Sequence, residues 1–405
     1  MCENYRVLSP VGSGGFDIEH IDGTTVVFDC GSIPGCNVAN CILHYRDFLV
    51  NIGEKLEIDY LILSHFDQDH INGLKFLSQH FTIKNIIVPY IPQRYRVIYN
   101  YVTNFSVTSF YSLITQSQFL TGVRILGSKN YSAMINRYQS IKSRNGNWEW
   151  IYKSIFSCSQ WEQLRGVLVK EGILRGTLPE DDNDFFDNPF DKSDLESWKS
   201  KVTEVVDSWS QEADNDDFDA GQNGISIEDF DIDSYVDNAE LSDDQMERIN
   251  KAVGELSGQS NPSYAKNENG LLMLSKKRVA KVSSELFYPC AFPFPFIHHL
   301  PCHCSGPLSA CIYTGDMRFD VKSCPTILDF LRFAGEQLLL FQIPHHGSVR
   351  NSSADYLQVL PSELFFWHDK DYSRIHKNTS VMKNITPYRL IFIDTVSYFV
   401  CDFKI

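Results

Sequence analysis

The feature that most constrains this chain is a cluster of metal-ligand side chains directly after a short apolar segment. Residues 58–63 form a mainly apolar run that predicts a buried strand ending at Ser64. Four potential metal ligands fall within the next six residues: His65, Asp67, Asp69 and His70. On a helix these side chains would point in several directions, whereas on a tight loop after a strand they can converge. Imidazole and carboxylate groups together suit zinc, manganese or iron.

A polar helix cap is the alternative interpretation of this cluster. Apolar residues recur at helical spacing after it, which predicts a helix that begins beside His70: Ile71, Leu74, Leu77 and Phe81. Asp69 would then cap that helix. Because a cap does not need two histidines flanking two aspartates, the sequence favours a metal site.

Three later segments repeat the pattern of an apolar strand followed by a polar residue. Residues 310–313 run into Asp316, residues 338–343 run into His345 and His346, and residues 364–367 run into His368. Open α/β architectures place ligands at the ends of strands in this way. Asp316 and the His345-His346 pair therefore supply the ligands that the first cluster lacks, and Asp316 is suited by type to bridge two ions.

The remaining strand signals indicate an α/β layer. Strands are expected at Tyr5–Leu8, Thr24–Asp29, Ile86–Pro89 and Gly270–Leu274. The first two flank a glycine-rich stretch, Val11–Phe16, which we interpret as a strand turn. A phosphate-binding loop is the other interpretation of these glycines, but no Gly-Lys-Ser/Thr follows them.

The charge of the chain is distributed unevenly. Residues 180–247 contain 24 acidic residues and three lysines, a local charge of −21, so the rest of the chain carries +6 within a total of −15. Such charge density predicts a solvated or loosely held segment. Residues 93–179 are rich in aromatic and basic side chains, with stretches compatible with helices. We therefore expect an inserted region at 93–264, helical and aromatic at 93–179 and acidic at 180–247.

Nothing in the sequence indicates a membrane or a disulfide scaffold. No apolar run reaches the roughly 18 residues that a membrane-spanning helix needs, and the N-terminus lacks the layout of a signal peptide. The natural expectation is a cytoplasmic chain. Its eleven cysteines are an odd number without a regular framework, which favours reduced thiols. A group with C-x-C spacing allows either a structural zinc or incidental thiols: Cys290, His298, His299, Cys302 and Cys304.

These motifs together resemble the metallo-β-lactamase superfamily. Residues 64–73 look like its metal-binding signature, and Thr314-Gly315-Asp316 and His345-His346-Gly347-Ser348 look like its later motifs. The hydrolase domain of ComEC-type DNA-uptake proteins is the most similar variant. Its further motifs are matched by Val11-Gly12-x-Gly14, Phe28–Gly31, Asn267 with Gly270–Leu272, and His376. The match covers roughly residues 5–92 and 265–405.

The resemblance implies an α/β fold, the four-layered αββα metallo-β-lactamase sandwich, with a large, partly helical and acidic insertion. The hydrolase domain would comprise residues 1–92 and 265–405. One or two divalent ions, Zn²⁺ or Mn²⁺, would activate a water molecule. The implied metal ligands are His65, Asp67, Asp69, His70, Asp316 and His345. Asp69 would also orient or deprotonate the water, and His346 or His376 would contact the developing oxyanion or protonate the leaving group.

The sequence departs from the superfamily pattern at two ligand positions. Asp67 stands where the common motif has a histidine, and Asn267 stands in place of the usual middle histidine. The site is therefore richer in oxygen donors, which shifts its preference toward harder ions such as manganese. Gly270 also stands where the ComEC-type variant usually has a serine.

The resemblance favours a phosphodiesterase or nuclease that acts on nucleic acid. Basic residues among aromatic ones in the inserted region suit contact with a single strand: Arg94, Arg96, Arg124, Arg137, Lys142 and Arg144. Equally, those aromatic residues can form the core of the insertion itself. Two other functions remain open, a hydrolase of cyclic nucleotides or another small ester, and a catalytically weak regulatory subunit whose inserted region docks a protein partner.

Overall fold

The structure is a computed structural model that describes a little under half of the chain. The described residues are 4–89, 91, 138–155, 166, 270–278, 297–299, 309–317, 324–334, 338–347, 362, 364–369 and 390–402, and every structural statement concerns these. Several positions singled out in the sequence lie outside them: His376, Asn267, the acidic residues 180–247, and the thiols of Cys290, Cys302 and Cys304.

The N-terminal part of the chain supplies five strands of the first seven-stranded sheet, and β11 and β16 come from its later part. Its strand order is β11-β16-β1-β2-β3-β5-β7. The strands are β1 (Tyr5–Leu8), β2 (Ser13–Ile21), β3 (Thr24–Ile33), β5 (Tyr60–Ile62), β7 (Ile86–Ile87), β11 (Ile297–His299) and β16 (Tyr398–Asp402). Strands β1 to β3 pair antiparallel, whereas β3, β5 and β7 are parallel neighbours. The carboxyl ends of β3 and β5 therefore lie at the same edge of the sheet.

The expected turn at Val11–Phe16 is partly wrong, because β2 already begins at Ser13. The hairpin turns instead at Asp22-Gly23, between β2 and β3. Both residues have positive φ, 53° and 71°. An Asp-Gly pair meets that requirement because aspartate tolerates the left-handed region and glycine has no Cβ.

The second seven-stranded sheet contains the later strand segments. Its order is β15-β14-β13-β12-β10-β9-β8. The strands are β8 (Gln139–Lys142), β9 (Trp148–Ile155), β10 (Gly270–Lys277), β12 (Ala310–Tyr313), β13 (Leu338–Gln342), β14 (Leu364–His368) and β15 (Leu390–Ile393). Strands β12 to β15 are parallel neighbours, so their carboxyl ends also share one edge.

Part of the region expected to be an insertion belongs to this second sheet. Strand β9 pairs antiparallel with β10 along its whole length, and β8 pairs with β9. Residues 139–155 are thus an integral piece of the fold rather than of a separate insert. The rest of the expected domain division stays a prediction.

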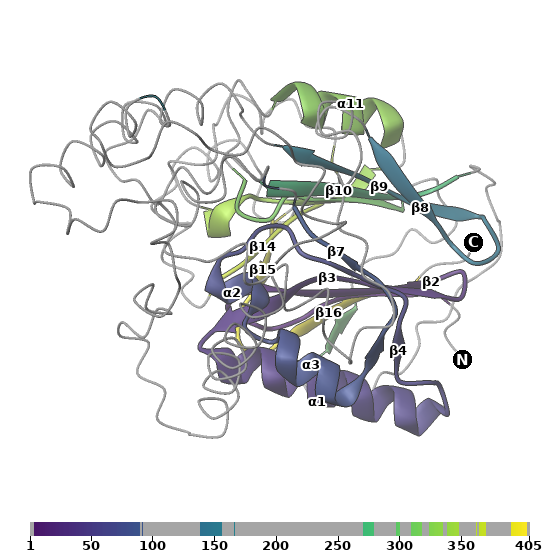
Figure 1. Ribbon diagram of the computed structural model, residues 1–405, viewed down its shortest axis with the longest axis vertical. Coiled ribbons are helices and arrows are strands. Elements are labelled where there is room, and N and C mark those ends of the chain that lie inside the picture. The colour runs from purple at the N-terminus through teal and green to yellow at the C-terminus, as the bar shows by residue number, and fades with distance from the viewer. Residues whose placement is uncertain are drawn as a thin grey trace, which may run out of the picture.

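Helices cover the outer faces of the two sheets (Figure 1). Helix α1 (Gly35–Ile52) packs against β3 and α3 (Leu74–His80), whereas α11 (Cys324–Ala334) packs against β10. Short elements complete the description: α2 (Gln68–Ile71), the paired strands β4 (Glu57–Ile58) and β6 (Thr82–Ile83), and the 3-10 turn His345–Gly347. Among the described residues, none of the helices combines the length and the apolar character needed to cross a bilayer.

The two sheets share a hydrophobic core. Phe28 and Ile62 of the first sheet belong to the same buried cluster as Met273, Tyr313 and Phe366 of the second. The rings of Phe28 and Tyr313 lie 4.9 Å apart between centroids. A second apolar cluster lies under α11 on the opposite face of the second sheet. The mixed α/β class is therefore confirmed, and the four-layered metallo-β-lactamase architecture stays a prediction.

A buried polar network also joins the sheets. The carboxylate of Glu19 accepts hydrogen bonds from Arg6 in its own sheet and from Trp150, Ser275 and Tyr313 in the other sheet. Arg6 and Glu19 are both fully buried. Because a buried charge is tolerated only when it is paired and hydrogen-bonded, this network favours one relative placement of the two sheets.

Candidate metal centre

The candidate site lies where the carboxyl ends of β5, β12 and β13 meet. The loop after β5 leads through Ser64 and His65 into α2, which begins at Gln68. Asp67 occupies the N-cap position but makes no side-chain capping bond there, and Asp69 lies inside the helix. The helix-cap interpretation of the cluster is therefore wrong for the described structure.

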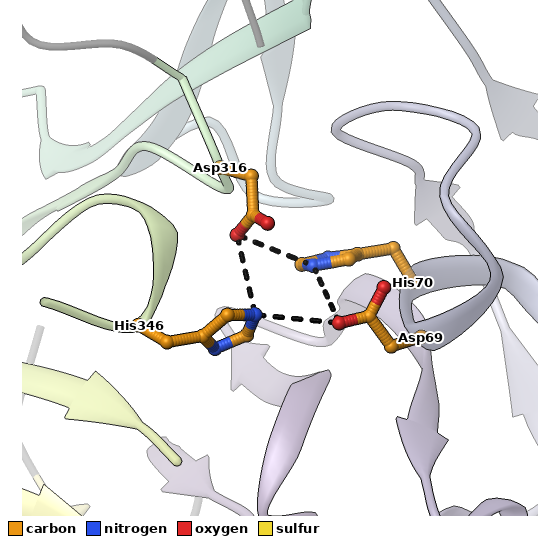
Figure 2. A group of neighbouring side chains, drawn as sticks. All are labelled: Asp69, His70, Asp316 and His346. Atoms are coloured by element: carbon orange, nitrogen blue, oxygen red, sulfur yellow. Dashed lines mark ion pairs between the residues drawn. The ribbon is translucent and has the colours of Figure 1, made fainter. Parts of the chain in front are cut away.

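Four side chains from two sheets converge at this edge (Figure 2). Asp69 and His70 come from α2, Asp316 follows β12, and His346 follows β13. One ligand atom of each residue lies within 4.8 Å of the others. Nε2 of His346 is 3.3 Å from Oδ2 of Asp69 and 3.5 Å from Oδ1 of Asp316. Nε2 of His70 is 3.8 Å and 3.4 Å from the same two oxygens.

The donor set and its spacing fit a divalent cation. A tetrahedron with metal–ligand bonds of about 2.0–2.2 Å has edges of about 3.3–3.6 Å, close to the separations found here. Among the described residues, Nε2 of His70 and of His346 is buried without a hydrogen-bond partner, and so is Nε2 of the adjacent His65. Buried polar atoms normally have partners, so nitrogens left without one point to a missing ligand. The buried group can bind a metal ion.

The opposite nitrogen of each imidazole is held by a specific partner. Nδ1 of His70 donates to Oδ2 of Asp29 at 2.8 Å, and Nδ1 of His346 donates to the carbonyl oxygen of His368 at 2.7 Å. Nδ1 of His65 lies 2.8 Å from Oγ of Ser64. A proton held on Nδ1 leaves the lone pair of Nε2 for a metal, which is the usual arrangement of metal-binding histidines.

Three further expected ligands lie beside the group. Nε2 of His65 is 3.8 Å from Oδ2 of Asp67 and 3.9 Å from Oδ2 of Asp316. Nδ1 of His345 is 3.4 Å from the same oxygen of Asp316. The two oxygens of Asp316 therefore face different sets of side chains, as its expected bridging role requires.

The geometry favours a different assignment of the two adjacent histidines. We expected His345 as a ligand and His346 as a group that contacts the reacting atoms. In the structure His346 belongs to the buried group: its Nδ1 donates to the carbonyl oxygen of His368, and its Nε2 faces Asp69 and Asp316. His345 is partly exposed. His376, the other expected catalytic histidine, lies outside the described residues.

Two residues at the site had no role from sequence reasoning. Asp29 lies within β3, in the run Phe28–Gly31, and has a positive φ of 60°, and its carboxylate accepts hydrogen bonds from His70 and Ser64. The available signal was an aspartate at the end of the expected strand Thr24–Asp29, which the structure extends to Ile33. His368 contributes only its backbone carbonyl, which no side-chain pattern reveals.

The electrostatics show that the site attracts positive charge. Burial lowers the pKa of His346, but the carboxylates of Asp316 and Asp69 outweigh burial and raise that pKa to about 9. Burial likewise opposes protonation of His70, yet Asp29, Asp69 and Asp316 hold its pKa well above the usual value. Burial raises the pKa of Asp69 and Asp316, but the neighbouring histidines more than reverse this and keep both carboxylates ionised. A cation would replace the protons that the site otherwise gathers.

Two glycines bring the backbone of the first sheet against α2, which carries Asp69 and His70. A Cβ at Gly31 would lie 2.5 Å from the carbonyl carbon of Asp69 and 2.6 Å from the amide nitrogen of His70. A Cβ at Gly14 would collide with the carbonyl oxygen of Asp69 and with Gly31. Gly14 and Gly31 therefore support Asp69 and His70 by close approach.

Comparison with known proteins gives only remote similarity. No family profile matches this chain, and no curated protein matches its sequence. A peroxy diiron form of the chemotaxis sensor ODP aligns with 37% of this chain and 49% of its own, at 13% identity and a TM-score of 0.22. The metallo-β-lactamase fold protein YhfI from Bacillus subtilis aligns with 38% of this chain and 54% of its own, at 14% identity and a TM-score of 0.23.

The apo state of ODP from T. denticola gives a similar result, 35% of this chain and 46% of its own at 14% identity, with a TM-score of 0.20. The chain thus spans about half the length of the structures it matches. Similarity at this level does not assign a family.

Proposed function

We propose that this protein is a metal-dependent hydrolase of the metallo-β-lactamase fold. The observation that carries the proposal is the convergence of Asp69, His70, Asp316 and His346 from two sheets, with the Nε2 atoms of both histidines buried and without a hydrogen-bond partner among the described residues. The order of motifs along the chain and their position at strand ends support the fold assignment.

The side chains of the site divide into those that hold a cation and those that face the substrate. Asp69, His70, Asp316 and His346 would hold one ion, and His65 and Asp67 with the second oxygen of Asp316 would hold another. A divalent cation here would lower the pKa of a coordinated water toward about 7, which provides a nucleophile at neutral pH. Because the pKa of Asp69 is low, its carboxylate is better suited to bind a metal ion than to accept a proton from water.

His345 is the side chain that we assign to the substrate. It is partly exposed beside the buried group, with Nδ1 3.4 Å from Oδ2 of Asp316. An imidazole in that position can donate a hydrogen bond to a developing oxyanion or a proton to a leaving group. His346 cannot do so while Nδ1 is bonded to the backbone and Nε2 is directed into the group.

Phosphodiester bonds of nucleic acid are the substrate class that we propose. Support comes from the positive charge of the chain outside residues 180–247, and from the basic and aromatic side chains at 93–179. An oxygen-rich donor set that suits manganese is compatible with a phosphodiester substrate.

The test combines substrate and variant series on the full chain. Wild type, Asp316→Asn and the matched control Asp47→Asn are incubated with Mn²⁺ or Zn²⁺ and labelled single-stranded DNA, double-stranded DNA or RNA. Asp47 is an exposed carboxylate paired with Arg46, so its substitution leaves the site intact. We expect cleavage by wild type and Asp47→Asn and its loss in Asp316→Asn.

Other outcomes separate the rival functions. Cleavage of a cyclic nucleotide or a simple ester without cleavage of nucleic acid would replace the proposed substrate class and keep the hydrolase. A wild-type chain that takes up neither ion would overturn the hydrolase itself and favour a regulatory subunit.

A further inference from the structure

Ser64 lies at the junction between the two halves of the candidate metal site. One half, with His65 and His70, follows β5 of the first sheet, and the other half, with Asp316, follows β12 of the second. Ser64 is 2% exposed. Its environment therefore has to satisfy each of its polar atoms from within the protein.

Every polar atom of Ser64 has a partner. Its amide nitrogen donates to Oδ1 of Asp29 at 2.6 Å, and its hydroxyl donates to Oδ2 of Asp29 at 2.8 Å. Its carbonyl oxygen accepts a hydrogen bond from the amide of Leu271, at the start of β10, at 2.7 Å. The residue is thus fastened to both sheets through its backbone, and its hydroxyl has little freedom to move.

Gly315 closes the space around the hydroxyl. A Cβ at Gly315, which has a φ of +54°, would lie 2.6 Å from both Cβ and Oγ of Ser64. The carbonyl oxygen of Gly315 in turn accepts a hydrogen bond from the amide of His345 at 3.2 Å. The hydroxyl is therefore enclosed between the loops that carry the two halves of the site.

The direction of these hydrogen bonds determines the state of His65. Because the hydroxyl hydrogen of Ser64 is directed to the carboxylate of Asp29, Oγ can serve only as an acceptor toward His65. Nδ1 of His65 must then carry the proton, and Nε2 presents its lone pair to the site, where it is buried and has no hydrogen-bond partner in the part of the chain that the structure describes. Asp29 imposes the same arrangement on His70 through its Nδ1.

We propose that Ser64 is a positioning residue whose hydroxyl fixes the tautomer and direction of His65 and couples them to Asp29. One carboxylate and one hydroxyl thereby orient two imidazoles for metal binding. This inference rests on the proposed function, since it deepens the account of the same site. Residues that hydrogen-bond to metal-binding histidines contribute about 10-fold to 100-fold to metal affinity. Removal of the Ser64 hydroxyl should lower the affinity by a factor in that range.

The metal experiment measures binding of Mn²⁺ alone and Zn²⁺ alone to the full chain by calorimetry. We expect Ser64→Ala to bind about 10-fold to 100-fold more weakly than wild type, and Ser64→Thr, which keeps a hydroxyl, to bind within about threefold of it. Ser78→Ala is the matched control, because the Ser78 hydroxyl bonds only to the carbonyl of Lys75 on α3. Asp29→Asn should weaken metal binding, and the double variant that combines it with Ser64→Ala should bind metal no more weakly than Asp29→Asn alone. A purely structural role would give independent losses in the double variant.

The second readout needs no metal. Long-range ¹H–¹⁵N spectra of histidine-labelled apo protein at pH 8, assigned with His65→Gln, report which nitrogen of His65 carries the proton. We expect Nδ1–H in wild type and a shift toward Nε2–H in Ser64→Ala. Wild type with Nε2–H, or a folded Ser64→Ala that binds metal within twofold of wild type, would overturn the inference. If wild type binds no metal, the proposed function fails, while the wild-type spectrum still decides the role of Ser64.

Discussion

Nε2 of His346 lies 3.3 Å from Oδ2 of Asp69, although Asp69 lies in α2 after β5 of the first sheet and His346 lies in the turn after β13 of the second. This approach requires that the segments after β5 and β13 meet at one edge of the shared core. The site and the fold are therefore tested by the same substitutions.

The two adjacent histidines should differ in their effect on metal binding. His346→Ala removes a ligand nitrogen from the buried group, whereas His345→Ala removes a partly exposed ring. We expect His346→Ala to weaken Mn²⁺ binding by more than about 100-fold, beyond the range of outer partners, and His345→Ala by only a few fold. Calorimetric titration of both variants measures this. The reverse order would restore His345 as the ligand.

Metal binding should strengthen as the pH rises. In the metal-free protein His346 has a pKa of about 9 and the pKa of His70 is also raised, so both carry an extra proton at pH 7. A cation must displace those protons before it binds. We expect affinity to increase from pH 6 toward pH 9, with release of about one to two protons per ion at pH 7. Calorimetry in buffers of different ionisation enthalpy counts them, and an affinity independent of pH would contradict the electrostatic account.

Gly31→Ala should damage the site without removing a polar side chain. Its new methyl group would lie 2.5–2.6 Å from backbone atoms of Asp69 and His70, which is well inside van der Waals contact distance. Such overpacking costs about 1–3 kcal/mol, and displacement of the loop should weaken metal binding at least about 10-fold. Gly35→Ala is the control, because its nearest neighbour, Nδ2 of Asn72, would lie at an ordinary 3.5 Å. Equal behaviour of the two variants in urea unfolding and metal titration would show that close approach at Gly31 is unimportant.

Glu19→Ala should destabilise the packing of the two sheets. It leaves the buried guanidinium of Arg6 without its carboxylate and removes the acceptor of Trp150, Ser275 and Tyr313. Loss of one partner from a buried pair costs about 3–5 kcal/mol in the free energy of unfolding. Asp47→Ala, which breaks an exposed pair with Arg46, should cost less than about 1 kcal/mol. Similar urea midpoints for both variants would contradict the shared core.

Three strands of the second sheet, β12, β13 and β14, could be predicted from sequence because their apolar runs are short and end in polar residues. Ala310–Tyr313 is confirmed at both ends, and β13 and β14 match their expected runs to within one residue. The parallel pairing of these strands then brings Asp316 and His346 to one edge, as the pattern of strand ends indicated.

Other elements were missed for physical reasons. Strands β8 and β9 lie among aromatic and basic residues that we interpreted as an inserted region. Their place in the sheet follows from the pairing of β9 with β10 and of β8 with β9. The Asp22-Gly23 pair is a typical sequence for a hairpin turn, but we expected the turn at the nearby glycines of 11–16. The exchange of roles that we propose between His345 and His346 depends on one backbone carbonyl, that of His368, and no residue pattern encodes it.

The most direct test of the metal centre is a crystal structure of the full chain soaked in Mn²⁺, with an anomalous difference map collected for manganese. The predicted result is a peak within about 2.0–2.4 Å of Nε2 of His70, Nε2 of His346 and the carboxylate oxygens of Asp69 and Asp316. No peak among these four side chains, or a peak held by other residues, would contradict the account.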